Sequence, residues 1–268
     1  MNLGISGKKA VVTGAGGAIG SSIAELLVEE GAEVALWDIN EQRVRERAED
    51  IQDTRAFAVG CDAMDAQSAH AAMETTLSRF GTLDILINCA GGSRKETTTA
   101  PDLSFFDMLP EEMQKTIGLN YFASVIPCQQ AGRVFADKGK GVILNISSIA
   151  GILPVTRGIS YSDGKAAANS FTRWLAVHMA QNYSPDIRVN ALAPGFLLTE
   201  QNRFLLVDSE TGRPTPRGQT VTSQVPMSRY GRPEEIAAAA VFLVSDRASF
   251  ITGSVLQADG GLCAFLGV

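Results

Sequence analysis

The chain has 268 residues, of which 45% are hydrophobic and 19% are charged, enough for a large buried core. Its net charge of −6 excludes the basic surface that nucleic acid or an anionic membrane would require. No apolar run approaches the ~20 residues of a membrane span, and the first residues lack the charged-then-apolar order of a secretory signal. We therefore expect a cytoplasmic globular protein that binds neither nucleic acid nor membranes.

Short β-rich runs alternate with longer amphipathic runs along the chain. Apolar strands that are separated by helices pair in parallel and are buried on both faces. We expect strands over 8–14, 33–38, 55–62, 83–91, 141–148, 187–195 and 254–261, and helices over 18–31, 40–51, 65–81, 110–139, 161–183 and 233–245. Asp65 should cap its helix, and Pro127 should kink the longest one. The pattern predicts one doubly wound α/β domain over 1–268, with about seven strands.

Residues 196–230 do not fit this alternation, because the segment is too long for an ordinary connection between two sheet elements. It carries many polar groups and prolines around an apolar stretch at 204–207. We expect it to form a lid over a substrate site, with a small helix of its own.

The cysteines and histidines argue against metal or histidine chemistry. Four scattered cysteines form no C-x-x-C pair, which is typical of reduced, buried thiols in a cytosolic protein. The only two histidines, His70 and His178, are far apart on predicted helices. We therefore expect no metal centre and no histidine-based catalytic triad.

A glycine-rich stretch, TGAGGAIG at 13–20, joins the first strand to the first helix. Gly14 permits the sharp turn, and Gly16 and Gly17 let the backbone approach a ligand. Gly20 lets the helix pack close to the sheet, and the N–H groups around Ile19 are available to a phosphate. A strand before the turn and a helix after it are what dinucleotide binding requires. The Gly-Lys-Ser/Thr of a nucleoside-triphosphate loop is absent.

Asp38 ends the second strand, at the distance where a carboxylate accepts the ribose hydroxyls of NAD. It would repel the 2′-phosphate of NADP, and no Lys or Arg stands at 15–18 or 37–39 to attract one. We therefore expect NAD rather than NADP, with the alternative that Asp38 only caps the next helix. Asp62 and Ala63, after the third strand, are candidate adenine contacts, and Asp62 is equally well explained as a turn residue.

Five different short motifs follow one another along the chain: TGAGGAIG (13–20), NCAG (88–91), ISS (146–148), YSDGK (161–165) and PGFLLT (194–199). Their order and spacing resemble those of the short-chain dehydrogenase/reductase family over nearly the whole chain. Two positions depart from the family pattern, since Ala18 stands for a glycine and Cys89 for an asparagine. The resemblance implies a Rossmann-type fold and an NAD(P)-dependent enzyme that interconverts alcohols and ketones.

Tyr161 and Lys165 lie four residues apart and therefore share one helix face. An ammonium beside a phenol favours the phenolate, as does an oxidised nicotinamide ring. Lowering the Tyr161 pKa from ~10 to ~7 requires about 4 kcal/mol. Tyr161 could then exchange a proton with the substrate oxygen, to which Ser148 would donate a hydrogen bond. Without the other motifs, the pair would be explained as an incidental surface pair.

The resemblance implies further site residues. Lys165 would also bind the nicotinamide ribose, and Asn120 would hold a water that passes protons to Lys165, unless Asn120 only kinks or caps its helix. Residues expected to support the cofactor are Asn88, Ala90 and Gly91, and those expected around the nicotinamide amide are Pro194, Gly195 and Thr199.

The substrate depends on the lid rather than on the fold. Polar lid residues are Glu200, Gln201, Asn202, Arg203, Arg213 and Arg217. Gln201 and Asn202 could bind a polyhydroxylated substrate, and Arg203 could hold its carboxylate in a forked geometry. Ser93, Arg94 and Lys95 would add to this site. The alternative is that these residues are solvated loop charges.

Residues 176–219 resemble the D-mannonate (fructuronate) oxidoreductases of the family, which favours a sugar acid or polyol as substrate. Alternatives are a glucose or gluconate dehydrogenase, a 3-oxoacyl-carrier-protein reductase and a non-catalytic NADH-binding sensor. A sensor would be expected to lack at least one of the four expected catalytic residues, and this chain has all four: Asn120, Ser148, Tyr161 and Lys165. The resemblance also implies a homotetramer built through 110–139, 161–183 and the last strand. The apolar tail 260–268 suggests a subunit contact or packing within its own subunit.

Overall fold

The computed structural model describes residues 2–199, 203–209 and 211–265, and the strands form one parallel sheet. The strands are β1 Lys9–Thr13, β2 Glu33–Asp38, β3 Ala56–Gly60, β4 Ile85–Asn88, β5 Gly141–Ile146, β6 Ile187–Pro194 and β7 Val255–Ala258. Their order across the sheet is β3-β2-β1-β4-β5-β6-β7. All seven predicted strands are confirmed.

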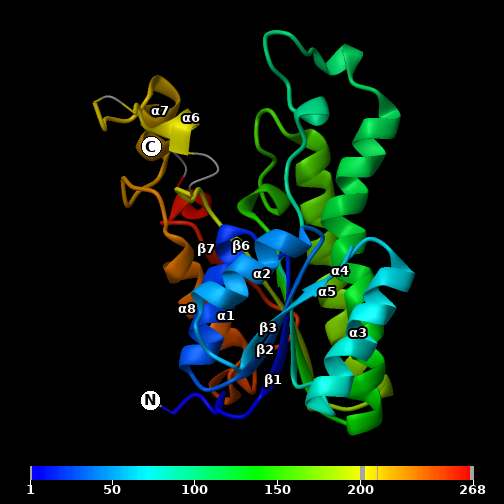
Figure 1. The fold of residues 1–268 in the computed structure, drawn as a ribbon. Helices are drawn as coiled ribbons and strands as arrows, with labels where there is room; N and C mark the ends of the chain where they lie inside the picture. The colour runs from blue at the N-terminus through cyan, green and yellow to red at the C-terminus, as the bar shows by residue number, and fades with distance from the viewer. Residues whose placement is uncertain (1, 200–202, 210, 266–268) are drawn as a thin grey trace.

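Helices cover both faces of this sheet (Figure 1). One face carries α1 Ala18–Glu29, α2 Glu41–Asp50 and α8 Pro233–Val244, and the other carries α3 Ala66–Phe80, α4 Pro110–Lys138 and α5 Ile159–Asn182. Short 3₁₀ turns are η1 Lys95–Thr97, η2 Phe105–Asp107, η3 Ile149–Gly151, η4 Asp246–Ala248 and η5 Leu262–Ala264. The predicted doubly wound α/β architecture is confirmed.

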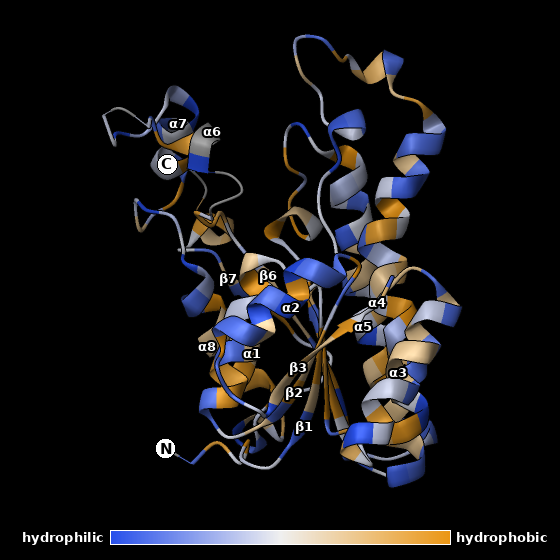
Figure 2. Cartoon of the chain, viewed as in Figure 1, coloured by the Kyte–Doolittle hydropathy of each residue, from blue (hydrophilic) through white to orange (hydrophobic). Residues whose placement is uncertain are grey.

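The apolar strands form two core layers, one on each face of the sheet (Figure 2). Leu27 of α1 and Val241 of α8 pack in the first layer, and Phe135 of α4 packs in the second. Trp37 of β2 is fully buried, and its indole Nε1 donates to Thr76 Oγ1 at 3.0 Å. Burying each large side chain contributes about 1.5–3 kcal/mol, so the sheet is a rigid support for the loops at its edges.

The helix ends follow local side-chain chemistry. Asp65 caps α3 by accepting a hydrogen bond from Ser68 N at 2.7 Å, as predicted. Asn40 caps α2 in the same way by accepting from Arg43 N at 3.0 Å. Helix α4 continues through Pro127 without interruption.

The strand order reverses between β1 and β4, because the chain runs outward from β1 to β3 and then returns to β4. Loops that leave neighbouring strands in opposite directions open a crevice at the carboxyl edge of such a sheet. Thr13 pairs with Asn88, and Asn88 with Asn145, so the ends of β1, β4 and β5 lie side by side. The predicted motifs therefore meet at one edge.

Two long segments rise beyond this edge (Figure 1). One is residues 89–109, between β4 and α4, which contains η1 and η2. The other is 196–230, whose described residues form two short helices instead of the one predicted, α6 Arg203–Leu206 and α7 Pro216–Gln224. The Tyr230 hydroxyl donates to the Gly218 carbonyl at 2.9 Å and ties the end of this segment to α7.

Within the described residues, none of the helices is both long and apolar enough to cross a membrane. The same residues contain no group of three or more His, Cys, Asp or Glu side chains that could hold a metal ion. The four cysteines are free thiols, and Cys61 and Cys128 are buried.

Candidate active site

The glycine turn after β1 lies directly against the NCAG loop after β4. Gly14 adopts a φ of +64°, and a Cβ at this position would lie 2.7 Å from Ala90 N. The Thr13 hydroxyl accepts hydrogen bonds from Cys89 N at 3.2 Å and Ala90 N at 3.3 Å. Only glycine therefore permits this contact, which joins the two loops at the point where the strand order reverses.

The N-terminus of α1 has the features of a phosphate site. Gly17 is its N-cap, and no side chain of the described residues caps it. A Cβ at position 20 would lie only 2.8 Å from Ala15 Cα. Because Gly20 has no Cβ, the helix packs tightly on the turn. The first N–H groups of α1, around Ile19, are therefore available to an anion.

Asp38 lies beside this turn and does not cap α2. Its Oδ2 accepts from Gly16 N at 2.9 Å, and its Oδ1 accepts from Asn40 N at 2.9 Å. Because Asn40 is the cap of α2, the alternative reading of Asp38 as a helix cap is wrong. Each carboxylate oxygen keeps accepting capacity for a ligand hydroxyl.

Arg43 is a cation beside the glycine turn that the sequence pattern did not predict. Its Cδ lies 3.5 Å from where a Cβ on Gly16 would stand, and Asp38 Oδ2 lies 3.0 Å from the same point. Residues 15–18 and 37–39 contain no Lys or Arg, whereas Arg43 reaches back to the glycine turn from the first turn of α2. A cation and a carboxylate therefore border the same space above Gly16.

Asp62 and Ala63 follow β3, on the far side of β2 from the glycine turn. Asp62 Oδ1 accepts from Met64 N at 2.8 Å, and Asp62 N donates to Ser68 Oγ at 2.9 Å. The turn role of Asp62 is thus observed. Contact of either residue with an adenine stays a prediction.

Three predicted catalytic residues come together where β5 ends and α5 begins. They are Ser148, Tyr161 and Lys165. Tyr161 lies in the first turn of α5, with the Ser148 side chain near its hydroxyl. The Lys165 Nζ lies 5.9 Å from the centroid of the Tyr161 ring and donates to the Ile146 carbonyl at 2.8 Å. The Ser148 hydroxyl accepts from Ala150 N at 3.1 Å, which fixes its position at the start of η3.

Burial dominates the titration of both groups. It raises the pKa of Tyr161, and the hydrogen bond with Ser148 opposes this effect only in part. Burial lowers the pKa of Lys165 to about 8, and the nearby Cys89 thiol opposes the shift. The expected fall of the Tyr161 pKa is therefore not produced by the protein's own groups, because desolvation penalises the phenolate.

Asn120 joins α4 to the loop after β4. Its Oδ1 accepts from Gly92 N at 3.0 Å, and its Nδ2 donates to the Gly92 carbonyl at 2.9 Å. A Cβ on Gly91 would lie 2.9 Å from Asn120 Oδ1 and 3.1 Å from Lys165 Nζ. Asn120 lies in the middle of α4, so the alternative of a helix cap is wrong. The asparagine and the lysine therefore meet at Gly91.

The glycine inside YSDGK has a packing role of its own. A Cβ on Gly164 would lie 2.7 Å from Asn120 Cβ, so its absence lets α5 approach α4 closely. The Tyr–Lys spacing places both side chains on one face of α5, and Gly164 presses the adjoining face against Asn120. One five-residue motif thus brings three of the four predicted catalytic residues within reach of each other.

Asn88 lies beneath the site rather than in it. It is fully buried, and its Nδ2 donates to Asn145 Oδ1 at 2.8 Å. Asn145 in turn donates to Thr172 Oγ1 at 2.9 Å. This buried row links β4, β5 and α5 and supports the loops above it.

The PGFLLT motif leads from β6 into the 196–230 segment. Pro194 is the last residue of β6, and Gly195 N donates to the Ala258 carbonyl at 3.0 Å. A Cβ on Gly195 would lie 2.7 Å from Asp259 Cα. The Thr199 carbonyl accepts from Arg203 N at 3.0 Å, which starts α6.

The predicted substrate residues differ in their surroundings. Arg94 pairs with Glu112, with 2.9 Å between Nη2 and Oε2, and more loosely with Glu96. Ser93 and Arg203 are exposed. Predicted ligands that lie outside the described residues are Glu200, Gln201 and Asn202.

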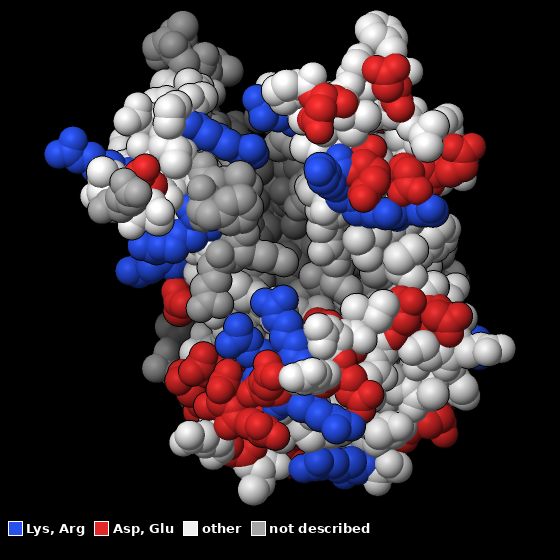
Figure 3. Space-filling view, turned by 45° about the horizontal axis from the view of Figure 1, so that its top comes forward, with Lys and Arg blue, Asp and Glu red and all other residues white. Residues whose placement is uncertain are grey.

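A hollow opens between the 89–109 and 196–230 segments, and both Lys or Arg and Asp or Glu side chains lie on the surface around it (Figure 3). The glycine turn and Ser148 follow β1 and β5 at the strand edge beneath these segments, and Tyr161 lies in the first turn of α5. The geometry therefore combines a phosphate-binding turn, a phenol with a hydroxyl partner and a buried amine at one crevice.

Comparison with known proteins agrees with this geometry. Residues 14–263 match the family model described as enoyl-(acyl carrier protein) reductase. A solved candidate D-mannonate oxidoreductase from Haemophilus influenzae, with bound NAD, is 36% identical with a TM-score of 0.91, over 100% of this chain and 99% of that one.

Two further relatives have other substrates. A 3-oxoacyl-(acyl-carrier-protein) reductase of Chlamydia muridarum is 34% identical over 98% of this chain and all of its own. A 7α-hydroxysteroid dehydrogenase, solved with NADH and 7-oxo glycochenodeoxycholic acid, is 33% identical with a TM-score of 0.82, over 97% of this chain and 96% of that one. The chain therefore belongs to the short-chain dehydrogenase/reductase family of oxidoreductases.

Proposed function

We propose that the protein transfers a hydride between NAD(H) and the secondary alcohol or ketone of a sugar acid or polyol, of the D-mannonate/fructuronate type. The similarity to the candidate D-mannonate oxidoreductase supports this substrate class. Relatives of similar identity act on 3-oxoacyl groups and steroids, so the substrate assignment depends on the crevice itself.

The residues around the glycine turn fit a dinucleotide. The uncapped start of α1 would bind the pyrophosphate, and the Asp38 carboxylate would accept the ribose hydroxyls. Further proposed contacts are Asp62, Ala63, Ala90, Gly91, Pro194, Gly195 and Thr199. When bound, the cofactor supplies the hydride donor or acceptor and, in its oxidised form, a positive charge near Tyr161.

Tyr161 is the proposed acid/base. Its hydroxyl gives a proton to the substrate oxygen during reduction and takes one during oxidation. Ser148, which lies near the Tyr161 hydroxyl, donates to the same substrate oxygen as charge develops there. Lys165 holds its ammonium between the Ile146 carbonyl and Gly91, where it binds the ribose and relays protons toward Asn120.

The 196–230 segment is the proposed substrate lid within one dinucleotide-binding domain. It is anchored at its base, where Leu198 N donates to the Gly231 carbonyl at 3.1 Å. Its outer part consists of α6 and α7, which pack on each other. Such a segment can adapt to different substrates while the sheet edge stays fixed.

The charge of the crevice rim is the observation that carries the sugar-acid proposal. Arg203, Arg213 and Arg217 of the lid are exposed, and none has an ion pair with another described residue. Lys95, on the 89–109 segment opposite, is likewise exposed and has no ion pair with another described residue. Unpaired cations on the two segments that flank the crevice, in a protein with a net charge of −6, favour an anionic substrate.

An absorbance assay of NADH formation with a substrate panel tests this proposal. The panel holds D-mannonate, D-gluconate, glucose, a neutral polyol, a 3-hydroxyacyl thioester and a 7α-hydroxysteroid. We expect the highest kcat/KM for one of the two acids. Turnover restricted to the thioester or the steroid would reassign the substrate, and NADH binding without any turnover would favour a sensor.

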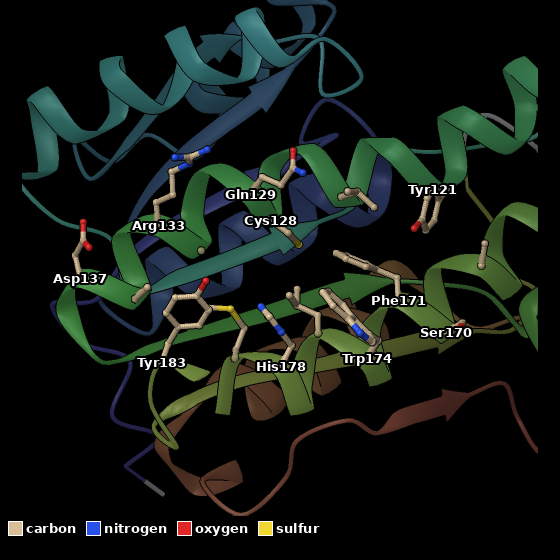
Figure 4. A pocket seen from close by; sticks show the side chains of 16 residues that line it. Tyr121, Cys128, Gln129, Arg133, Asp137, Ser170, Phe171, Trp174, His178 and Tyr183 are labelled. Atoms are coloured by element: carbon tan, nitrogen blue, oxygen red, sulfur yellow. The ribbon is translucent and has the colours of Figure 1, made fainter. Parts of the chain in front are cut away.

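We also propose a cytoplasmic homotetramer. A groove of about 1210 Å³ runs between α4 and α5 and is lined by Tyr121, Phe171 and Trp174 (Figure 4). The Trp174 side chain is 59% exposed, and Tyr183 is 55% exposed. Large exposed aromatic residues at this groove, on α5 and at its C-terminal end, favour burial against a second subunit. Light scattering on the Trp174→Asp variant should show smaller assemblies than wild type; an unchanged mass would contradict this interface.

A further inference from the structure

Three residues of α4 stand four positions apart, and each holds one residue of the loop that follows β4. They are Glu112, Thr116 and Asn120, which share one face of the helix. Their partners are Arg94, Thr97 and Gly92. We name this set of three contacts the α4 ladder.

The two inner contacts of the ladder are buried. Asn120 is 1% exposed and binds both the N–H and the carbonyl of Gly92. The Thr97 and Thr116 hydroxyls are 2.9 Å apart, and both residues are almost fully buried. Thr116 also links to its neighbours, since its carbonyl accepts from Asn120 Nδ2 at 2.9 Å.

The outer contact is an ion pair. Glu112 Oε2 is 2.9 Å from Arg94 Nη2, and its other oxygen binds Lys115. The hydrogen bond with Lys115, aided by the charge of Arg94, lowers the pKa of Glu112, so the pair stays ionised at neutral pH. Arg94 thus faces the helix, whereas its neighbours Ser93 and Lys95 are exposed.

We propose that Glu112, Thr116, Arg94 and Thr97 are positioning residues, which clamp the 92–97 loop onto α4 as one wall of the substrate site. This inference rests on the proposed oxidoreductase function and replaces the predicted role of Arg94 as a substrate ligand. The clamped loop presents Ser93 and Lys95 to the crevice.

The ladder also acts on the proton relay. Its last residue, Asn120, meets Lys165 at Gly91, where a Cβ would contact both side chains. A loop released at Arg94 or Thr97 frees Gly92, and the Asn120 amide then keeps only its bond to the Thr116 carbonyl. Misplacement of such a group lowers turnover rather than cofactor affinity.

A double-mutant cycle between Arg94 and Glu112 in the full-length protein tests the clamp. Arg94→Ala and Glu112→Gln should each lower kcat/KM by about tenfold, and the double variant should lose no more than either single variant. Lys115→Ala is the matched control, because it removes the other partner of Glu112 without touching the loop. It should stay within about twofold of wild type. NADH affinity, measured by fluorescence, should be unchanged in all four variants.

Substitutions of Thr116 provide a second test of the clamp, in which a conservative variant should restore the wild-type behaviour. Thr116→Val should lower kcat and shift the pH midpoint of kcat, and Thr116→Ser, which keeps the hydroxyl, should restore both. Hydrogen–deuterium exchange of residues 89–99 should be faster in Thr116→Val and Arg94→Ala than in wild type. The exchange measurement needs no turnover, so it tests the clamp even if no panel substrate reacts.

Three results would overturn the clamp. One is additive losses in the double variant. Another is a rise in KM that is confined to acidic substrates in Arg94→Ala and absent in Glu112→Gln, as expected of a direct substrate ligand. The third is exchange in residues 89–99 that matches wild type in both variants. Activity is measured with whichever panel alcohol the wild type oxidises, so failure of the sugar-acid proposal is seen separately in the wild-type assay.

Discussion

The carboxyl edge of the sheet and the lid above it differ in almost every physical respect. At the edge, Asn120 and Lys165 are almost fully buried, and each is held by backbone groups. In the lid, Arg203, Arg213 and Arg217 are exposed and pair with no other described residue. The proposed catalytic groups are thus buried and desolvated, whereas the proposed substrate contacts are exposed charges.

The 92–97 loop stands between these extremes. It belongs to the crevice wall like the lid, but it is clamped to α4 at three points. The contrast predicts that edge substitutions change turnover by large factors, and lid substitutions change substrate affinity by small ones. The following substitutions test that contrast.

Tyr161→Phe should cause the largest loss. Removing the proposed acid/base is expected to lower kcat by about 10²–10⁴-fold, and NADH should bind as in wild type, because the ring and its packing remain. Steady-state kinetics and fluorescence titration check the two parts. Retained turnover would remove Tyr161 from the mechanism and with it the assignment of chemistry to the edge.

Lys165→Met should lose most activity while gaining stability. Burial holds the pKa of Lys165 at about 8, below its ordinary 10.5, so the folded state penalises the charged amine. Between these values the unfolded chain binds more protons, so wild-type stability should rise with pH relative to the variant. The rise should be on the order of 2–3 kcal/mol from pH 8 to pH 10.5, as measured by urea unfolding. A flat difference would mean that the amine is solvated.

Asp38→Ala should narrow the preference for NAD over NADP by about tenfold, because it removes a carboxylate that repels the 2′-phosphate. Arg43→Ala in the Asp38→Ala background should restore part of that preference, since Arg43 is the cation beside the same space. Ratios of kcat/KM for the two cofactors measure both effects. An unchanged ratio in Asp38→Ala would assign Asp38 a purely structural role in holding Gly16.

Arg203→Ala should have the smallest effect. We expect KM for a sugar acid to rise by about three- to tenfold with kcat unchanged, and KM for a neutral polyol to stay constant. Arg213→Ala is the matched lid variant for comparison. Equal effects on the acid and the polyol would mean that Arg203 supports the lid rather than binding a carboxylate.

The sequence predicted the fold well because each strand and helix is specified by local patterning. The seven apolar runs became the seven strands, and Asp65 capped its helix as expected. Residues 92–109 have no helical or strand period, so their two 3₁₀ turns and their attachment to α4 were not foreseen. The second lid helix was missed for the same reason.

The candidate site was predicted in its residue types but not in its interactions. Arg94 pairs with Glu112, eighteen positions away, because α4 turns back along the loop. Arg43 reaches Gly16 only because α2 begins beside the glycine turn. The pKa of Tyr161 was expected to fall because of a neighbouring positive charge, whereas burial raises it.

The amino-acid sequence by itself determined the strands, the helices that cover the sheet and the motif chemistry, since these depend on neighbours a few positions apart. The tertiary structure decided which charges are paired, which groups lose water and which loop is clamped. Those properties arise from contacts between residues that are remote in the chain, and desolvation and ion pairing depend on that surrounding shell.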